Sequence, residues 1–354
     1  LVLTGQVPPG HLLGLTFTNK AAHELLGRTR EYLGRARELG VLPEIDEGDD
    51  GEVFDADPKI ATYHSFASGI ITEHGLRIGV EPHVRLLSDG AREQLAARII
   101  ATTDRDMSDV TDAPHQLVKK LLGLDDAMSE LGLSPDQVRD DATRLIESLT
   151  AIENSSKLIE VGREMRATAR FRIALVGLVE DFRAAKHART MIDFADQVRL
   201  ARQLVREFPE VRTQLRSTYQ AVLLDEYQDT SIAQRLLLQE IFGKGHPVTA
   251  VGDPCQAIYE WRGASVVNIE RFTDHFPVVE GDQVRSAHTY PLLDNRRSGP
   301  AILELANEIS VSLRADRRGL DPLVPAPRDD LHPGHVRVAL LNTVADELDF
   351  VADE

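Results

Sequence analysis

Two adjacent carboxylates, Asp225 and Glu226, follow an apolar run that ends at Leu224, within the longer segment Leu223–Thr230. Phosphoryl transfer from a nucleoside triphosphate uses a carboxylate that holds Mg²⁺ and a second group that orients or deprotonates the attacking water. Asp225 suits the metal, and Glu226 suits the water. The pair alone leaves a second interpretation open, in which a strand simply ends in two acidic residues that cap a helix.

A second segment, Val251–Ala264, contains a Gly-Asp-Pro turn, then Gln256, and then Tyr259, Trp261 and Arg262 close together. A glutamine near a triphosphate can donate a hydrogen bond to the terminal phosphate. Aromatic rings and guanidinium groups stack on the bases of single strands, worth about 1–3 kcal/mol per base. The only tryptophan of a chain is commonly a core residue, but the neighbouring Arg and Gly favour the edge of a loop.

These segments require a sheet that brings strand ends together. Apolar runs, each followed by a helical stretch, predict a parallel sheet, and such sheets bind ligands at the carboxyl ends of their strands. Thr18 or Asn19 can cap the helix expected from Lys20 to about Gly34. The strands are expected at residues 10–18, 59–62, 219–224 and 247–252.

The region from residue 90 to 186 has helical periodicity almost throughout and contains no strand-like run, which indicates a mostly helical insertion. Near the end of the chain the pattern predicts a helix at 301–311 and a strand over His335–Leu341. The expected helices of the insertion are Arg92–Ala101, Ala113–Gly123, Ser134–Ile152 and Glu164–Ala185.

Composition constrains the class of protein. The formal net charge of −17 argues against a nucleic-acid partner, but charge acts locally. Much of it lies in the stretch from Glu44 to Asp57, which has no Lys or Arg and which we expect to be a solvated or disordered loop. The single cysteine, Cys255, excludes an internal disulfide and a cysteine zinc site, and it fits a cytoplasmic compartment. No apolar run is long enough for a transmembrane helix.

The segments Leu223–Thr230 and Val251–Ala264 resemble motifs of the UvrD, Rep and PcrA family of superfamily 1A helicases. Leu223–Thr230 is similar to motif II of that family, and Val251–Ala264 is similar to motif III. Four further segments occur in family order: Leu15–Ala22 (motif Ia), Thr62–Phe66 (motif Ib), Met191–Asp196 (the short motif before motif II) and Leu293–Ser298 (motif IV).

The resemblance implies an α/β fold in which a RecA-like parallel-sheet P-loop NTPase domain (1A) is interrupted by an all-helical domain (1B) and followed by the start of a second RecA-like domain (2A). It also implies an ATP-dependent 3′→5′ DNA helicase or translocase that acts in repair or recombination on single-stranded or junction DNA, with ATP and Mg²⁺. The implied boundaries are 1–89 and 187–287 for 1A, 90–186 for 1B and 288–354 for 2A.

The resemblance also implies a role for each matching residue. Asp225 would hold Mg²⁺, Glu226 would be catalytic, and Gln256 would sense the γ-phosphate. Arg297 would stabilise charge on that phosphate, although a lone Arg is more often a surface residue. For two of the implied DNA contacts, strand core (Phe17) and helix capping (Asn19) remain alternatives. The implied DNA contacts are Thr16, Phe17, Asn19, Thr62, His64, Tyr259, Trp261 and Arg262.

Three departures from the family pattern qualify this interpretation. Arg296 stands where the family usually has a Tyr that stacks on adenine, and a guanidinium plane can also stack there. Glu260 replaces a usual Gly beside Trp261 and should repel phosphate unless it pairs with Arg262. The chain has no Gly-x-x-x-x-Gly-Lys-Ser or -Thr loop for the phosphates.

In the family this loop lies upstream of the position of Leu1, so we expect an incomplete motor without DNA-stimulated ATPase on its own. The alternative is a non-catalytic helicase-like subunit that binds DNA or a partner and has lost its nucleotide site. The forms of motifs III and IV look closer to the RecB, AddA and AdnB recombination helicases. That resemblance would imply a partner helicase-nuclease subunit and a nuclease domain elsewhere.

Overall fold

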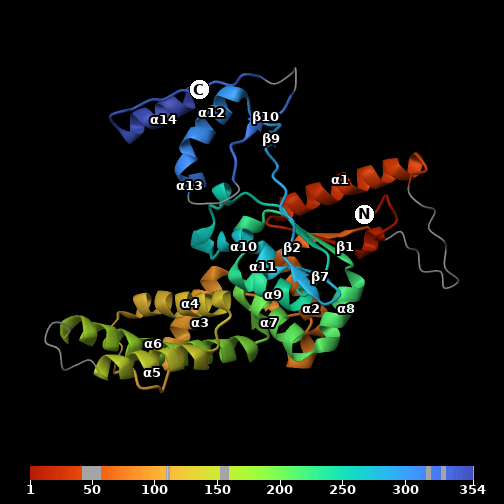
Figure 1. Ribbon diagram of the computed structural model, residues 1–354. Helices are drawn as coiled ribbons and strands as arrows, with labels where there is room; N and C mark the ends of the chain where they lie inside the picture. The colour runs from red at the N-terminus through yellow and green to blue at the C-terminus, as the bar shows by residue number, and fades with distance from the viewer. Residues whose placement is uncertain are drawn as a thin grey trace. The chain divides into compact units, whose positions relative to one another are not determined.

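The computed structural model describes residues 1–41, 57–108, 110, 112–151, 159–315, 320–327 and 332–353 (Figure 1). The chain divides into two compact units, Leu1–Ala287 and His288–Glu354, and each is described by itself. The acidic stretch expected to be a loop lies outside the described residues except for Asp57, which pairs with Arg30 at 2.6 Å.

A four-stranded parallel sheet forms the centre of the first unit, which confirms the α/β class expected from the apolar runs. In its register Leu15 pairs with both Ala61 and Leu224, so three strands end at the same edge. That edge therefore receives the residues that follow each strand. The spatial order of the strands is β2 (Lys59–Thr62), β1 (Leu12–Thr16), β5 (Ala221–Leu224) and β6 (Val248–Ala250).

Helices pack on this sheet through one apolar core that includes Leu13, Leu15, Phe66, Leu204 and Phe242. The first helix is capped by the Thr18 side chain, which accepts from the Ala21 amide at 3.1 Å. Asn19 is therefore the first helical residue and not the cap. The helices of this part are α1 (Asn19–Glu38), α2 (Tyr63–His74), α7 (Phe194–Glu207), α8 (Pro209–Thr218), α9 (Ile232–Phe242), α10 (Val267–Glu270) and α11 (Phe272–His275).

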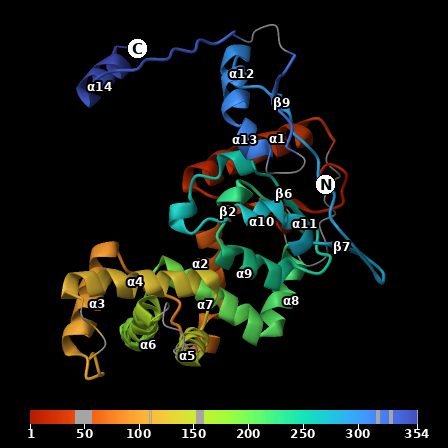
Figure 2. The ribbon, with the colours of Figure 1, turned by 60° about the vertical axis from the view of Figure 1, so that its left-hand side comes forward.

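Four helices between residues 89 and 187 have a core of their own, with Leu121, Met128, Val176 and Phe182 almost fully buried. Two of them, α5 and α6, pack along each other and lie side by side in both ribbon views (Figures 1 and 2). Within the described part of this region no strand forms, as its periodicity predicted. The helices are α3 (Asp89–Thr102), α4 (Pro114–Leu131), α5 (Pro135–Ala151) and α6 (Ile159–His187).

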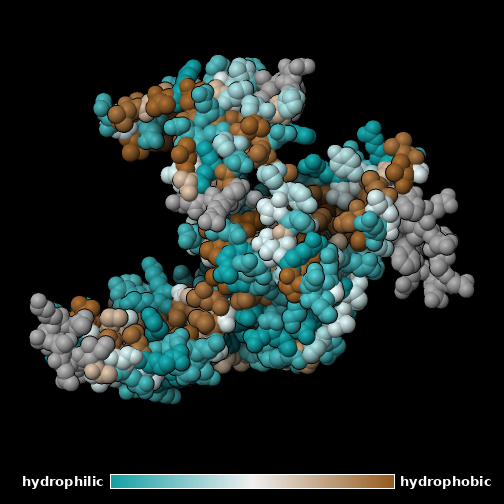
Figure 3. Space-filling model, viewed as in Figure 1, coloured by the Kyte–Doolittle hydropathy of each residue, from teal (hydrophilic) through white to brown (hydrophobic). Residues whose placement is uncertain are grey.

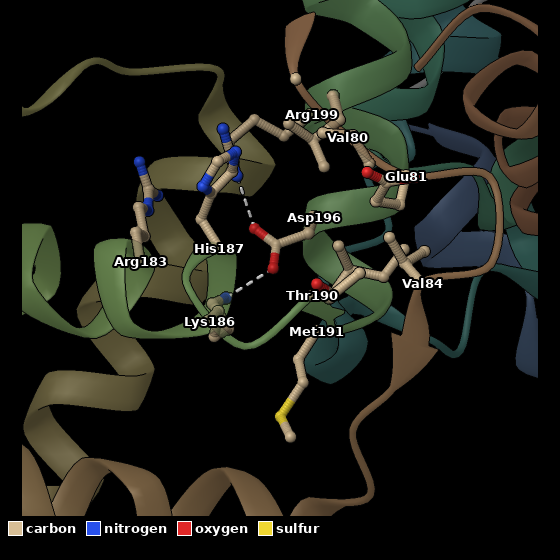
Figure 4. A pocket seen from close by; sticks show the side chains of 13 residues that line it. Val80, Glu81, Val84, Arg183, Lys186, His187, Thr190, Met191, Asp196 and Arg199 are labelled. Carbon is tan, nitrogen blue, oxygen red and sulfur yellow. Dashed lines mark hydrogen bonds and ion pairs between the residues drawn. The ribbon is translucent and has the colours of Figure 1, made fainter. Parts of the chain in front are cut away.

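A buried ion network joins the helical core to the start of α7. The ammonium of Lys186, 2% exposed, lies 2.6 Å from Asp196, 2.7 Å from Asp193 and 3.3 Å from Asp125. The hollow beside it is lined by residues of α6, α7 and the loop around Val80, and Figure 4 shows Lys186 and Arg199 both directed at Asp196. Each of the three carboxylates also has an arginine: Arg183 for Asp125, Arg92 for Asp193 and Arg199 for Asp196.

Short elements complete the first unit. Two of them, β3 and β4, pair in parallel and link the helical insertion to the rest. The last two, β7 and β8, form an antiparallel hairpin. These elements are the 3-10 turns η1 (Pro9–His11), η2 (Gly75–Ile78), η3 (Tyr227–Asp229), η4 (Pro254–Gln256) and η5 (Glu260–Arg262), and the strands β3 (Arg85–Leu86), β4 (Met191–Ile192), β7 (Val278–Glu280) and β8 (Gln283–Arg285).

In the second unit, the prediction of a strand over His335–Leu341 is wrong. Val338 and Leu340 are 89% and 100% exposed, and no described strand of the unit pairs with this segment. Alternating apolar residues suggested a strand, but a strand requires a neighbour that supplies its hydrogen bonds. The elements present are β9 (Asp294–Asn295), α12 (Pro300–Ile309), α13 (Val311–Ala315), β10 (Val324–Pro325) and α14 (Val344–Ala352).

Apolar side chains of the second unit remain at its surface. Figure 3 shows them along α14, where Val344, Leu348 and Val351 are each more than 60% exposed. Among the helices that the structure describes in either unit, none is long and apolar enough to span a membrane.

Candidate functional site

Asp225 is held at the sheet edge by residues of the neighbouring strand β1 and by the first residue of α2. Its amide donates to the Leu15 carbonyl at 2.8 Å, which continues the ladder between β5 and β1. The Thr16 hydroxyl donates to its Oδ2 at 3.3 Å, and the Tyr63 hydroxyl donates to its backbone carbonyl at 3.2 Å. The parallel register therefore fixes both the backbone and one carboxylate oxygen of this residue.

The position of Thr16 favours a supporting role at Asp225 over its expected role as a DNA contact. Thr16 is the last residue of β1, and it is fully buried. Its hydroxyl is engaged by Asp225. A side chain without solvent exposure cannot reach a phosphate on a passing strand, so Thr16 belongs to the support of the carboxylate. The resemblance to motif Ia identified the segment that contains Thr16, but it could not show which way the side chain points.

Tyr63 was missed by the sequence analysis. It is 4% exposed, and burial together with the nearby Tyr227, Asp225 and Glu226 raises its pKa well above the ordinary value. The phenol therefore stays protonated and acts as a donor to Asp225. The available signal was its place directly after β2, a strand expected to end at the same edge as the carboxylates.

Glu226 has an unusual backbone, with φ 49° and ψ 43° in the left-handed region. A non-glycine residue in this region costs about 1–3 kcal/mol, and such strain is concentrated at functional sites. The side chain is exposed. Its Oε2 accepts from Gln228 Nε2 at 2.7 Å. The turn thus directs a carboxylate to the solvent side of the sheet edge, where a water molecule can be activated.

Gln256 lies on the neighbouring turn. Its Nε2 donates to Asp253 Oδ2 at 2.7 Å, and the Asp253 amide donates to Gln228 Oε1 at 3.1 Å. Gln228 is 1% exposed. It lies within the segment Leu223–Thr230, but the sequence analysis did not propose it as a site residue. A chain of hydrogen bonds therefore connects Glu226 to Gln256.

The donor set at Asp225 fits Mg²⁺. One carboxylate oxygen accepts from Thr16, and no bond from the described residues engages the other. Magnesium in triphosphate sites is held by one or two carboxylates, with water and phosphate oxygens for the rest. A single half-buried carboxylate at a strand end provides the protein share of such a site. The hollow beside Lys186 shares none of these residues.

Three aromatic rings form a row beside this edge. The rings of Phe17 and Tyr259 lie 4.7 Å apart between centroids, and those of Tyr259 and Trp261 lie 6.4 Å apart. Trp261 is 79% exposed, so the alternative of core packing is wrong for it. Phe17 lies just after β1 and is only half-buried, so it is not strand core either. The row offers flat apolar surface to solvent, as base stacking requires.

The other expected DNA contacts differ in availability. The Thr62 hydroxyl is occupied, because it accepts from the Ser65 amide at 3.1 Å and donates to Ser65 Oγ at 2.9 Å, and the residue is 8% exposed. It caps α2 and is poorly placed for phosphate. His64 is half-buried and lies edge-on to Phe194 at 5.8 Å. Asn19 has an exposed side chain. For Arg262 the structure describes the backbone turn η5 but not the side chain.

Arg296 and Arg297 belong to the second unit. Both are exposed and follow β9. The Asn295 side chain accepts from the amides of Arg297 and Ser298 at 2.9 and 2.8 Å, which fixes the turn that presents them. Their expected roles at the nucleotide stay predictions.

Comparison with known proteins matches residues 1–277 to the UvrD/REP helicase N-terminal domain. The chain belongs to the UvrD/REP helicase family. It is 25% identical over 303 residues to the ATP-dependent DNA helicase PcrA of Staphylococcus aureus (strain Mu50 / ATCC 700699), covering 86% of this chain and 34% of the relative. It is 26% identical over 302 residues to the ATP-dependent DNA helicase Rep of Escherichia coli (strain K12), covering 84% and 36%. The chain therefore spans about a third of the length of these relatives.

Proposed function

We propose that this chain supplies the nucleotide-hydrolysing edge of an ATP-dependent DNA translocase or helicase. The observation that carries the proposal is the position of Asp225 and Glu226 directly after β5, at the carboxyl edge of a parallel sheet and beside an aromatic row that ends in the exposed Trp261. The relatives PcrA and Rep are named as ATP-dependent DNA helicases.

Each polar residue of the edge has a separate task in this proposal. Asp225 would hold Mg²⁺, which when bound would supply positive charge beside the transferred phosphoryl group. Glu226 orients the attacking water and accepts its proton, and its exposed carboxylate leaves room for that water. Gln256 donates to the terminal phosphate through its side-chain amide. Thr16 and Tyr63 keep Asp225 in place through the two hydrogen bonds described above.

The aromatic row of Phe17, Tyr259 and Trp261 binds the single strand by stacking on its bases. Every base has a flat face, so stacking tolerates any sequence, as movement along DNA demands. This mode also reduces the conflict with the net charge of −17, because stacking requires no cation. His64, which is half-buried, and Asn19, which is exposed, lie near the same strand ends and serve the sugar-phosphate chain.

Finer features of the proposal rest on family resemblance. They are 3′→5′ polarity, a role in repair or recombination, and relation to the recombination type with a partner subunit. They also include stacking of Arg296 on the adenine and stabilisation of charge on the γ-phosphate by Arg297. We also propose that the sheet part is domain 1A, the helices from 90 to 186 domain 1B, and the second unit the start of domain 2A. Two separate cores, one on the sheet and one within the helices, support the division between 1A and 1B.

Glu226→Gln in the full-length protein tests the proposal. We expect ATP turnover to fall by at least about 100-fold, because the amide cannot take the proton of water. ATP binding should be retained within a few-fold. Glu164→Gln, at an exposed position on α6, is the matched control and should turn over ATP like the natural protein. A natural protein that binds no ATP would instead support the non-catalytic alternative.

A further inference from the structure

We propose that Gln228 is a positioning residue that connects the carboxylate of Glu226 to the turn bearing Gln256 and Trp261, so that nucleotide and single strand sense each other through it. This inference rests on the function proposed above and adds a specific route for coupling within that site.

The side chain of Gln228 uses both ends of its amide in a nearly solvent-free place. It is 1% exposed, donates from Nε2 to Glu226 Oε2 at 2.7 Å, and accepts at Oε1 from the Asp253 amide at 3.1 Å. The reverse orientation of the amide would set its oxygen against a carboxylate and its NH₂ against an N–H group. The environment therefore selects one orientation, and a buried amide satisfied at both ends is rigid.

Gly252 shows how closely the turn approaches this amide. A Cβ added there would lie 2.4 Å from Gln228 Oε1, so any side chain at this position would displace the Gln228 amide. The next residue, Asp253, then accepts from Gln256 Nε2 at 2.7 Å. Hydrogen bonds thus connect four residues in series, from Glu226 through Gln228 and Asp253 to Gln256.

Backbone hydrogen bonds extend this link toward the aromatic row. The Tyr227 amide donates to the Val251 carbonyl at 3.0 Å before the turn, and the Ser265 amide donates to the Thr230 carbonyl at 3.0 Å after it. In the sequence, Tyr259 and Trp261 lie between the two residues, Val251 and Ser265, that these hydrogen bonds hold. A strand that stacks on the row and shifts the turn therefore moves Asp253 relative to Gln228. The displacement is passed to Glu226, whose strained backbone leaves its carboxylate dependent on this support.

Two substitutions in the full-length protein separate the two ends of the amide. Gln228→Met removes the hydrogen bonds to Glu226 and to the Asp253 amide, together with the longer one from Nε2 to Asp229 Oδ2 at 3.4 Å. Gln228→Glu keeps an acceptor for the Asp253 amide and places a carboxylate against Glu226. Gln234→Glu is the matched control. Gln234 is 5% exposed, and it occupies the N3 position of the α9 capping box, where glutamate serves equally well.

Three experiments are made on each variant: steady-state kinetics for kcat and KM of ATP, thermal melting, and titration of a labelled oligothymidylate for its Kd with and without a non-hydrolysable ATP analogue. For both Gln228 variants we expect kcat to fall about 10- to 100-fold, as displacement of a reacting group by about 1 Å does, with KM within about twofold. The ratio of the two Kd values, which measures coupling between the sites, should approach one.

The outcomes distinguish the two proposals. If the natural protein shows no DNA-stimulated ATPase, the proposed function fails, and this inference fails with it. If the natural protein is active and coupled and Gln228→Glu keeps both kcat and the Kd ratio, only the inference is overturned. The same holds if Gln234→Glu lowers the Kd ratio as much, because burial rather than the specific contacts would then be responsible. Melting identifies a variant that fails to fold, and the isosteric Gln228→Glu then decides the result.

Discussion

Replacing Lys186 with Met should destabilise the first unit by about 3 kcal/mol. Lys186 is 2% exposed and contacts three buried or nearly buried aspartates. Removing one partner of a buried ion pair costs about 3–5 kcal/mol, because an uncompensated charge remains. The lower end applies here, since each aspartate keeps one arginine after the substitution. Methionine has a similar length, so little volume is lost.

Urea unfolding followed by far-UV circular dichroism measures this effect. With a slope of about 3 kcal/mol per molar urea, the expected loss lowers the unfolding midpoint by about 1 M. Lys119→Met, at an exposed position on α4, is the control and should stay within about 0.5 kcal/mol of the natural chain. A midpoint for Lys186→Met equal to that of the control would refute the reasoning, because the desolvation of Lys186 would then offset all of its pairing.

Three further predictions concern the strand surface, pH and a helix cap. Trp261→Ala should weaken single-strand binding by about 1–3 kcal/mol, measured by anisotropy of a labelled oligonucleotide, and normal affinity would remove it from the strand surface. The pKa of Asp196 is lowered because Arg199 and Lys186 together outweigh burial, the largest opposing effect, and the pKa of Lys186 is raised because its aspartates outweigh burial. The network should therefore contribute its full stabilisation of the folded chain between about pH 4 and pH 10. The difference in free energy of unfolding between the natural chain and Asp196→Asn should shrink as the pH falls below about 4. An unchanged difference at pH 3 would contradict this prediction. Thr62→Ala should cost about 1 kcal/mol in urea unfolding through loss of the α2 cap, and no loss would show that the cap is dispensable.

The sequence predicted the elements well where a strong local pattern was present. The apolar runs before Asp225 and after Pro247 became neighbouring parallel strands, and Thr18 was among the two residues expected to cap α1. The strand over His335–Leu341 failed because alternation reports a half-buried surface, whereas a strand also needs a partner. Local patterns do not contain the partner.

Side-chain direction at the site could not be predicted in the same way. Thr16 and Phe17 are adjacent, yet the first points into the core toward Asp225 and the second lies against Tyr259. Period-two alternation shows that neighbours on a strand face opposite sides, but it does not say which side holds the ligand. The role of Gln228 was equally hidden, because its partner Asp253 lies in another segment and is brought to it by the pairing of β5 and β6.

In the function proposed above, the order of these residues along the chain connects the strand surface to the carboxylates. Each segment that supports a carboxylate also carries a residue available to the strand: Thr16 precedes Phe17, and Tyr63 precedes His64. A strand that moves either contact therefore acts on a residue whose neighbour in sequence is bonded to Asp225. Consecutive Cα atoms lie only about 3.8 Å apart, so this proposed coupling acts over a short distance. A displacement of a reacting group by about 1 Å is enough to slow a reaction, so a small shift at the strand contact would be sufficient.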